Sequence, residues 1–373
     1  MTMRRALLLT HRWAGLVLGL ALVLIGITGS ILSFQREIDA ALNPALFRAS
    51  GSANPDLSYG AILRQAEAAT GRPAGSIRPP DSVWPVWVVS PVRGQRGAAT
   101  AYLDPATGAV LGERDGRAGF IGTTRQLHEA LLLRDWGGHE AVGWLGVALL
   151  VFALSGIWLW WPRQGSPGRA LVTIRRRPSL LFNLDLHRVI GIWMAAVLAV
   201  VAVSGVVLIF PGWFRPVFGI APPVAAAPAP PRREPMTVDA DAAAAAAMAH
   251  LPGQVVTGLL LPSRQRPLWQ VTLRPEASDP EVRARSVIGI DPWSGAVAEE
   301  RGPRTRGLAE ETLALQRWLH GGALLGWPGR LLVFASGLAM PVLFVTGLAA
   351  WLLRRRNRRR LAIPAGRRTE RTA

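Results

Sequence analysis

Four long segments without a charged residue constrain this chain more than any other feature of its sequence. They are Trp13–Gln35, Ala141–Trp161, Val189–Phe214 and Leu331–Leu353. A helix needs roughly twenty apolar residues to cross about 30 Å of hydrocarbon, so each segment is long enough to span a membrane. The first is also longer than the roughly 7–15 apolar residues of a signal peptide, so we expect it to be retained. The sequence therefore predicts a membrane protein built on a bundle of four transmembrane helices.

Arginines are distributed unevenly around these segments, and every basic residue of the chain is an arginine. Clusters precede the first segment, lie between the second and third, and follow the fourth as RRRNRRR at 354–360. Because arginine-rich flanks stay on the inner side of a membrane, we expect both termini inside and the two long connections outside. The net charge of +18 then reflects topology and attraction to the anionic lipid bilayer. It does not indicate a nucleic-acid partner.

The two long connections, 36–138 and 215–329, follow one pattern. In each, an alanine-rich helical stretch precedes an alternating apolar strand and a strand that ends in Asp-Pro-x-x-Gly-x-Val, at Asp104 and at Asp291. Proline and glycine at these positions are typical of a tight turn. Each connection therefore predicts a small extracytoplasmic α+β domain, with one helix on a short antiparallel sheet. A Leu-His pair precedes the next membrane helix in both halves, so we expect an internally duplicated protein.

These patterns define the expected boundaries along the chain. We expect helix one in 1–35, the first outer domain in 36–127, helix two and its preceding His segment in 128–162, a cytoplasmic loop in 163–186, helix three in 187–214, the second outer domain in 215–318 with a Pro-rich linker at 221–235, helix four and its His segment in 319–353, and a basic tail in 354–373. Each helix also contains a Ser-Gly or Thr-Gly pair, at 28–29, 155–156, 204–205 and 346–347. Small residues allow close backbone approach, so we expect these pairs to serve helix packing.

The histidines are the candidate functional residues, because the chain has no cysteine and only six histidines. If the halves are related by pseudo-symmetry, His11 and His187 face each other near the inner membrane face, and His128 and His320 do so near the outer face. Histidines on facing helices of a bundle are a common way to hold a metal or haem. Two such sites would relay electrons across a layer that one cofactor cannot bridge.

Simpler roles remain open for each histidine taken alone. A histidine at a helix start is often an interfacial residue whose polar tip reaches the headgroups. His139 has no counterpart in the second half, and it is either interfacial or an alternative outer ligand. His250 lies in the alanine-rich outer helix, where we expect it to face solvent.

Several motifs carry a resemblance to a known family. They are HRWAGL and TGSILSF in helix one, YLDPATGAVL, LHEALLL and SGIWLWWPR around helix two, HRVIGIW in helix three, GIDPWSGAV, and LHGGALLGWPGR and TGLAAWLLRR around helix four. Together they resemble the PepSY-associated transmembrane family, whose members include inner-membrane reductases that release iron from ferrisiderophores in the bacterial periplasm. The resemblance implies a bacterial inner-membrane protein with two periplasmic PepSY domains. It also implies haem ligation by His11, His187, His128 and His320, and it assigns no such position to His139.

The expected function is that of a membrane oxidoreductase with two haem b groups. Electrons would pass from a cytoplasmic donor, a flavoprotein or quinol, to a periplasmic acceptor, for which we favour the ferric iron of a siderophore. No Gly-x-Gly-x-x-Gly follows a strand, so the sequence offers no flavin or nicotinamide fingerprint of its own. One alternative is a non-enzymatic anchor whose PepSY domains bind or regulate peptidases. Another alternative is an iron-chelate transporter. Transporters often have helices that are interrupted at matching positions of both halves near the membrane midplane, and these segments show no such matched interruption.

Overall fold

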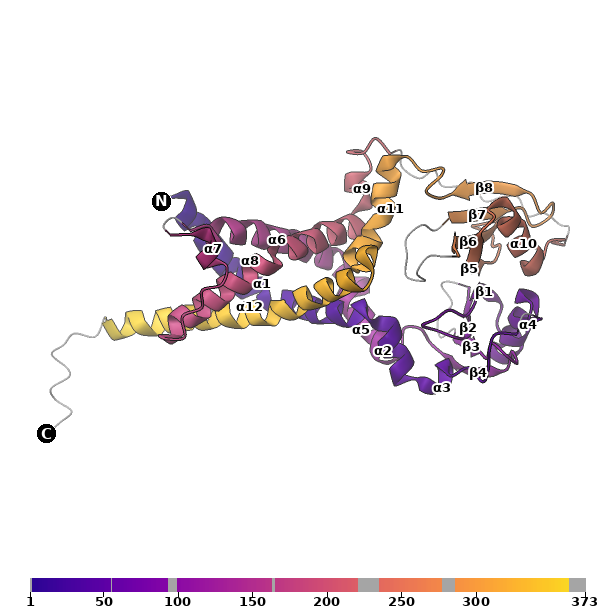
Figure 1. Ribbon diagram of the computed structural model, residues 1–373, viewed down its shortest axis with the longest axis horizontal. Helices are drawn as coiled ribbons and strands as arrows, with labels where there is room; N and C mark the ends of the chain where they lie inside the picture. The colour runs from indigo at the N-terminus through magenta and orange to yellow at the C-terminus, as the bar shows by residue number, and fades with distance from the viewer. Residues whose placement is uncertain are drawn as a thin grey trace.

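The computed structural model describes residues 2–54, 56–92, 99–162, 165–220, 235–276 and 286–361. Figure 1 shows a long helical bundle with a sheet packed at one end, and the start of the first bundle helix and the end of the last one at the opposite end. The expected linker at 221–235 lies outside the described residues except for its last residue, as do Arg163 and the final part of the basic tail.

The bundle consists of α1 (Met3–Ser33), α6 (Gly138–Trp160), α8 (Ser179–Ile209) and α12 (Gly326–Leu361). Among the described residues these are four helices that are long and apolar enough to cross a membrane, as predicted. Each helix contributes one buried side chain to a shared centre, made of Leu22, Leu145, Leu198 and Met340. Many other large apolar side chains point outward, for example Val17 and Leu20 at 75% and 67% exposure. A bundle that is apolar on its outside suits a lipid environment, and the chain is a multi-pass membrane protein.

Short elements connect the bundle to the sheet. They are α2 (Gln35–Leu42), α3 (Pro44–Phe47), α5 (Gly119–Ala130), the 3-10 turn η1 (Arg134–Trp136), α9 (Pro211–Phe214), α11 (Leu308–His320) and the 3-10 turn η2 (Ala323–Leu325), while α7 (Pro167–Ala170) lies between α6 and α8. Both α5 and α11 lie at the junction of bundle and sheet in Figure 1. The last turn of each contains a histidine, His128 or His320.

The sheet has eight antiparallel strands contributed equally by the two connections. The first supplies α4 (Tyr59–Thr70), β1 (Ala74–Arg78), β2 (Trp87–Pro91), β3 (Thr100–Leu103) and β4 (Val110–Arg114), and the second supplies α10 (Ala240–His250), β5 (Gln254–Leu260), β6 (Trp269–Pro275), β7 (Ser286–Ile290) and β8 (Val297–Arg301). The strand order is β4-β3-β2-β1-β5-β6-β7-β8. Helices α4 and α10 share one apolar core with the strands of both units.

The two α+β units, one from each long connection, are joined in one continuous sheet. They join where β1 pairs with β5, with Ser76 opposite Leu260 and Ile77 opposite Leu259. Each unit alone would leave this strand as an open edge with unpaired backbone groups. Asp241 of α10 adds a second link, since its carboxylate accepts hydrogen bonds from the first amides of α4 at 2.7 and 2.9 Å.

The predicted Asp-Pro turns are present in both units. The Asp104 carboxylate accepts from the amides of Ala106 and Thr107, each at 2.9 Å, and Asp291 accepts from the amides two and three residues later at the same distance. Gly108 and Gly295 follow with φ of 74° and 72°, a left-handed conformation that favours glycine. The turn chemistry inferred from the sequence is confirmed.

Helix α2 fastens the sheet to the bundle through three ion pairs. Arg36 pairs with Asp81 beyond β1 at 2.6 Å, and Asp39 pairs with Arg114 of β4 at 2.6 Å. Glu37 pairs with Arg330 of α12 at 2.7 Å. These partners are largely buried, with Asp39 at 3% and Arg330 at 5% exposure. The first unit of the sheet is thus held in place over the end of the bundle.

Candidate functional site

Four histidines form two pairs, one at each end of the bundle. His11 of α1 and His187 of α8 have ring centres 6.4 Å apart, and we call them the tail-side pair. His128 of α5 and His320 of α11 have ring centres 6.2 Å apart, and we call them the sheet-side pair. In each pair one histidine comes from the first half of the chain and one from the second. The structure thus brings together the partners that the sequence pairs.

Each histidine is held through Nδ1 by the hydroxyl of a Ser-Gly or Thr-Gly pair. The distances from Nδ1 to the hydroxyl oxygen are 2.7 Å for His11 with Ser155, 3.1 Å for His128 with Thr28, 3.2 Å for His187 with Thr346, and 3.1 Å for His320 with Ser204. The supporting helix always belongs to the same half of the chain as the histidine. We call each histidine with its hydroxyl and the adjoining glycine a cradle.

The hydrogen-bond network assigns the tautomer of all four rings. Every cradle hydroxyl donates its hydrogen to a backbone carbonyl of its own helix, for example Thr28 to Leu24 at 2.8 Å and Ser204 to Val200 at 2.7 Å. A hydroxyl that has donated its only hydrogen can then only accept from the ring, so Nδ1 carries the hydrogen. The lone pair is left on Nε2, as in a metal-ligating histidine.

Backbone carbonyls reinforce this assignment in three cradles. The Nδ1 atom of His128 lies 3.1 Å from the carbonyl oxygen of Ile25. The Nδ1 atom of His187 lies 2.9 Å from the carbonyl oxygen of Leu343, and that of His320 lies 2.9 Å from the carbonyl oxygen of Val201. A carbonyl oxygen can only accept. Within the described part of the chain, none of the four Nε2 atoms has a hydrogen-bond partner. All four rings are therefore supported on one side and free to bind on the other.

The cradle glycines contact the rings closely. A Cβ added at Gly205 would lie 2.9 Å from Cε1 of His320, and one at Gly29 would lie 3.0 Å from Cε1 of His128. At the tail-side pair the corresponding distances are 3.5 Å for Gly347 and 3.8 Å for Gly156. Our expectation that the Ser-Gly and Thr-Gly pairs serve helix packing was therefore wrong. These pairs contact histidines, and they belong to the candidate site, although their regular spacing from the histidines was the only signal of this in the sequence.

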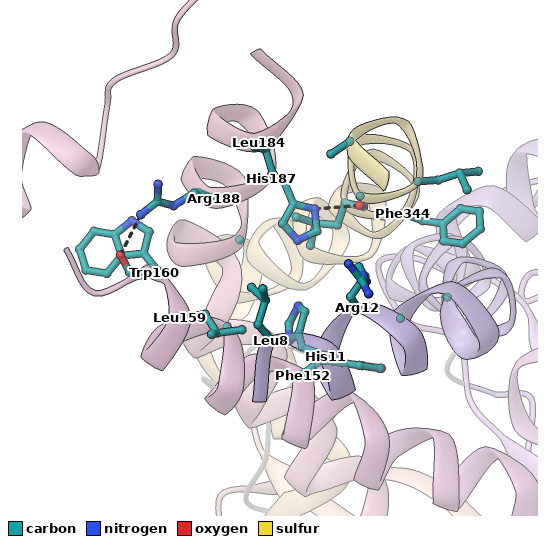
Figure 2. Close-up of a pocket in the computed structure, with 18 of the residues that line it drawn as sticks. Leu8, His11, Arg12, Phe152, Leu159, Trp160, Leu184, His187, Arg188 and Phe344 are labelled. Carbon is teal, nitrogen blue, oxygen red and sulfur yellow. Dashed lines mark hydrogen bonds between the residues drawn. The ribbon is translucent and has the colours of Figure 1, made fainter. Parts of the chain in front are cut away.

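A cavity of about 560 Å³ surrounds the tail-side pair. This lies within the roughly 300–1,000 Å³ of small-molecule and cofactor sites. Figure 2 shows His11 and His187 reaching into this space from different helices, with Phe152 and Phe344 nearby. Most of the lining is aliphatic or aromatic, and arginines complete it. The cavity can accept a large, flat, mainly apolar group.

Comparison with known proteins places the chain in a family. The model of the PepSY-associated TM region matches residues 8–354. The chain belongs to this family. No curated protein matches it. The matched region of this PepSY-associated protein includes α6 and α8, most of α1 and α12, both sheet units and both histidine pairs, so the resemblance noted from the sequence is confirmed for the family.

The two remaining histidines of this PepSY-associated protein have other partners. Nδ1 of His139 lies 3.0 Å from the carbonyl oxygen of Glu129, near the start of α6. His139 has no hydroxyl–glycine cradle, unlike His128, which faces His320. His250 is exposed, as predicted, and its Nε2 lies 2.8 Å from a carboxylate oxygen of Glu300.

Proposed function

We propose that this protein is a bacterial inner-membrane oxidoreductase that holds two haem b groups, one at each histidine pair. Electrons enter from a cytoplasmic donor, a flavoprotein or quinol, and leave to a periplasmic acceptor, the ferric iron of a siderophore. When bound, each haem supplies a one-electron couple between ferric and ferrous iron. The proposal rests chiefly on the geometry of the two pairs.

The ring spacing is what bis-histidine ligation requires. Metal–imidazole bonds are about 2.0–2.1 Å, and the ring centre lies about 1.1 Å beyond the ligating nitrogen. Two imidazoles on opposite sides of one metal would therefore have ring centres about 6.3 Å apart, and the distances here are 6.4 and 6.2 Å. Among the described residues, no third His, Cys, Asp or Glu joins either pair to form a site for a bare metal ion. The spacing of each pair would suit a haem, which needs only two imidazoles from the protein because its macrocycle supplies the remaining nitrogen ligands.

The residues of the chain also suit the separation and the tuning of two such sites. His11 and Thr28 lie on one helix, and a rise of 1.5 Å per residue separates them by about 26 Å. His187 and Ser204 have the same spacing. One pair thus lies near each end of the bundle, on a path across the membrane. Hydrogen bonds from Nδ1 fix the orientation of each ring, and they make the lone pair of Nε2 more basic and so a better metal ligand.

We favour the ferric iron of a siderophore as the acceptor, because its release needs only one electron. Siderophores bind ferric iron through hard oxygen ligands, which hold the larger and less charged ferrous ion weakly. A single electron delivered beyond the sheet-side pair therefore releases iron without breaking the chelator. The periplasmic location of the sheet is part of this proposal and follows from the arginine-rich ends of the bundle helices.

Haem content is the decisive test. We expect the detergent-purified protein to show a reduced-minus-oxidised b-type spectrum with two haems per chain. His187→Ala and His320→Ala should each retain one haem, because each removes one histidine of one pair, whereas a variant at the exposed His250, His250→Ala, should retain two. A protein that stays colourless after expression with ample haem would refute the proposal.

Acceptor reduction is tested on the same protein. The haems are reduced, excess reductant is removed, and a ferric siderophore is added with a colour-forming ferrous chelator. We expect haem reoxidation and ferrous iron in equal amounts, since each haem yields one electron. Stable reduced haem in the presence of ferric siderophores would exclude this acceptor class while leaving the electron-transfer proposal intact.

A further inference from the structure

The cavity around the tail-side pair has an excess of positive charge. Its lining includes five arginines and a single carboxylate, that of Asp185; the arginines are Arg4, Arg12, Arg175, Arg188 and Arg354. Guanidinium groups enclosed by apolar side chains are costly unless they have partners. The arginines that have no partner within the protein therefore indicate what kind of ligand the cavity binds.

Three of these arginines have partners within the protein. Arg175 pairs with Asp185, with two bonds between the side chains at 2.7 and 2.8 Å. Arg4 and Arg188 donate to the carbonyls of the last two residues of α6, at 3.0 and 3.3 Å. Carbonyls in the last turn of a helix have no intrahelical donor, so both arginines satisfy the end of α6. These contacts account for the presence of all three arginines, and no bound ligand is needed to explain them.

Arg12 and Arg354 have no hydrogen-bond or ion-pair partner among the described residues. The Nε atom of Arg12 is buried from solvent and makes no hydrogen bond. Figure 2 shows the Arg12 side chain extending from α1 into the space beside His187. Arg354 lies on α12 about 10 Å along the axis beyond Gly347, the cradle glycine of His187. Helical side chains lean toward the N-terminus, so Arg354 leans back toward that ring.

Arg12 also lies over the ring of Trp13, 5.2 Å from its centre, but neither guanidinium has an anionic partner in the described part of the chain. Two such groups beside an apolar cavity call for two anionic groups on one amphiphilic ligand. Carboxylates suit them best, because arginine can bind a carboxylate through two parallel hydrogen bonds. Haem b has this composition, with two carboxylates on one edge of an apolar macrocycle. We propose that Arg12 and Arg354 bind the two carboxylates of the haem held by His11 and His187. This inference rests on the proposed function and adds the residues that orient the group.

The test compares haem b with its dimethyl ester, which lacks both negative charges. Full-length His320→Ala protein, prepared free of haem in a neutral detergent, isolates the tail-side site. Absorbance titration then gives the two dissociation constants. We expect the ester to bind at least about tenfold more weakly, since charged hydrogen bonds contribute about 1.5–3 kcal/mol each. Adding Arg12→Gln and Arg354→Gln should bring the ratio of the two constants close to one.

Matched controls come from neighbouring arginines. Arg5 of α1 and Arg356 of α12 are exposed and do not line the cavity, so Arg5→Gln and Arg356→Gln should keep the parental ratio. The ratio is taken within one protein, so a general loss of folding cancels. Single Arg12→Gln and Arg354→Gln variants, each expected to lower the ratio in part, serve if the double variant does not fold.

Two results would overturn the inference. Equal affinity for haem and ester in the parent would show that the arginines do not contact the carboxylates. An unchanged ratio in the double variant would place the carboxylate contacts elsewhere. Failure of the His320→Ala protein to bind either porphyrin would be a different result, because it would refute the proposed function itself.

Discussion

Replacing the cradle glycines by alanine should damage the two histidine pairs to different extents. At the sheet-side pair, an alanine Cβ at position 205 would lie 2.9 Å from Cε1 of His320, whereas ordinary van der Waals contact begins at 3.4 Å. The ring must therefore retreat by about 0.5 Å, which is also about the tolerance of a preorganised site. It cannot do so freely, because Nδ1 is bonded to Ser204 and to the Val201 carbonyl at 3.1 and 2.9 Å.

The expected size of the effect follows from this overpacking. Adding one carbon to a closely packed contact costs about 1–3 kcal/mol, which corresponds to about 5- to 150-fold weaker binding at that site. Gly205→Ala, and Gly29→Ala with its 3.0 Å contact, should both weaken the sheet-side pair. Gly347→Ala is the matched control, since its Cβ would lie 3.5 Å from Cε1 of His187. It should leave the tail-side pair intact.

The assay is haem per chain after dilution and washing, together with the midpoint potential of each haem. Gly205→Ala should lose the haem that His320→Ala also loses, and it should retain the other. Full retention with unchanged potentials in Gly205→Ala would refute the packing argument. Equal losses in Gly205→Ala and Gly347→Ala would also refute it, because the structure gives these two positions different clearances.

Three further predictions concern the sheet and His139, the alternative outer ligand. Asp39→Ala should lower the free energy of unfolding by about 2–4 kcal/mol, measured with denaturant, because Arg114 loses a buried carboxylate. Burial alone would raise the pKa of Asp104, but hydrogen bonds led by that of the Ser50 amide lower it to about 2. Its contribution to stability is therefore complete above its unfolded pKa of 3.8 and is lost as pH falls toward about 2, which a melting series should detect. His139→Ala should keep both haems.

Each of these predictions has a clear contrary result. Unchanged unfolding of Asp39→Ala would mean that the ion pair contributes nothing, and Asp39→Asn is the milder companion variant. A melting temperature that does not fall on acidification, or that falls equally in Asp104→Asn, would contradict the role of that carboxylate. Loss of one haem in His139→Ala would assign an outer ligand to it and count against His128.

The sequence was sufficient for the bundle and for the pairing of the histidines. Twenty or more uncharged residues have few outcomes other than a membrane helix, and the Asp104 and Asp291 turns depend only on local chemistry. Pairing His11 with His187 required one further idea, that equivalent residues of two halves meet. The pattern of each half was regular enough to supply it.

What the sequence could not supply depends on contacts between distant segments. A Thr-Gly pair looks the same whether it faces another helix or a ring, so the role of Thr28 and Gly29 needed the position of His128. The single sheet is a similar case, because β1 and β5 carry no signal that distinguishes pairing with each other from lying at an open edge. The unpaired state of Arg12 likewise emerges only when its neighbours find partners elsewhere.

The arrangement of the cradles separates two tasks between the halves of the chain. Each half supports its own histidines, since His11 is held by Ser155 and His187 by Thr346. Each pair, however, takes one ring from either half. A ligand shared by a pair would therefore link the two halves at that end of the bundle, in addition to the β1–β5 pairing that joins them in the sheet. Under the proposed function, haem binding would stabilise the association of the halves further, so the haem-free protein should melt at a lower temperature than the loaded one.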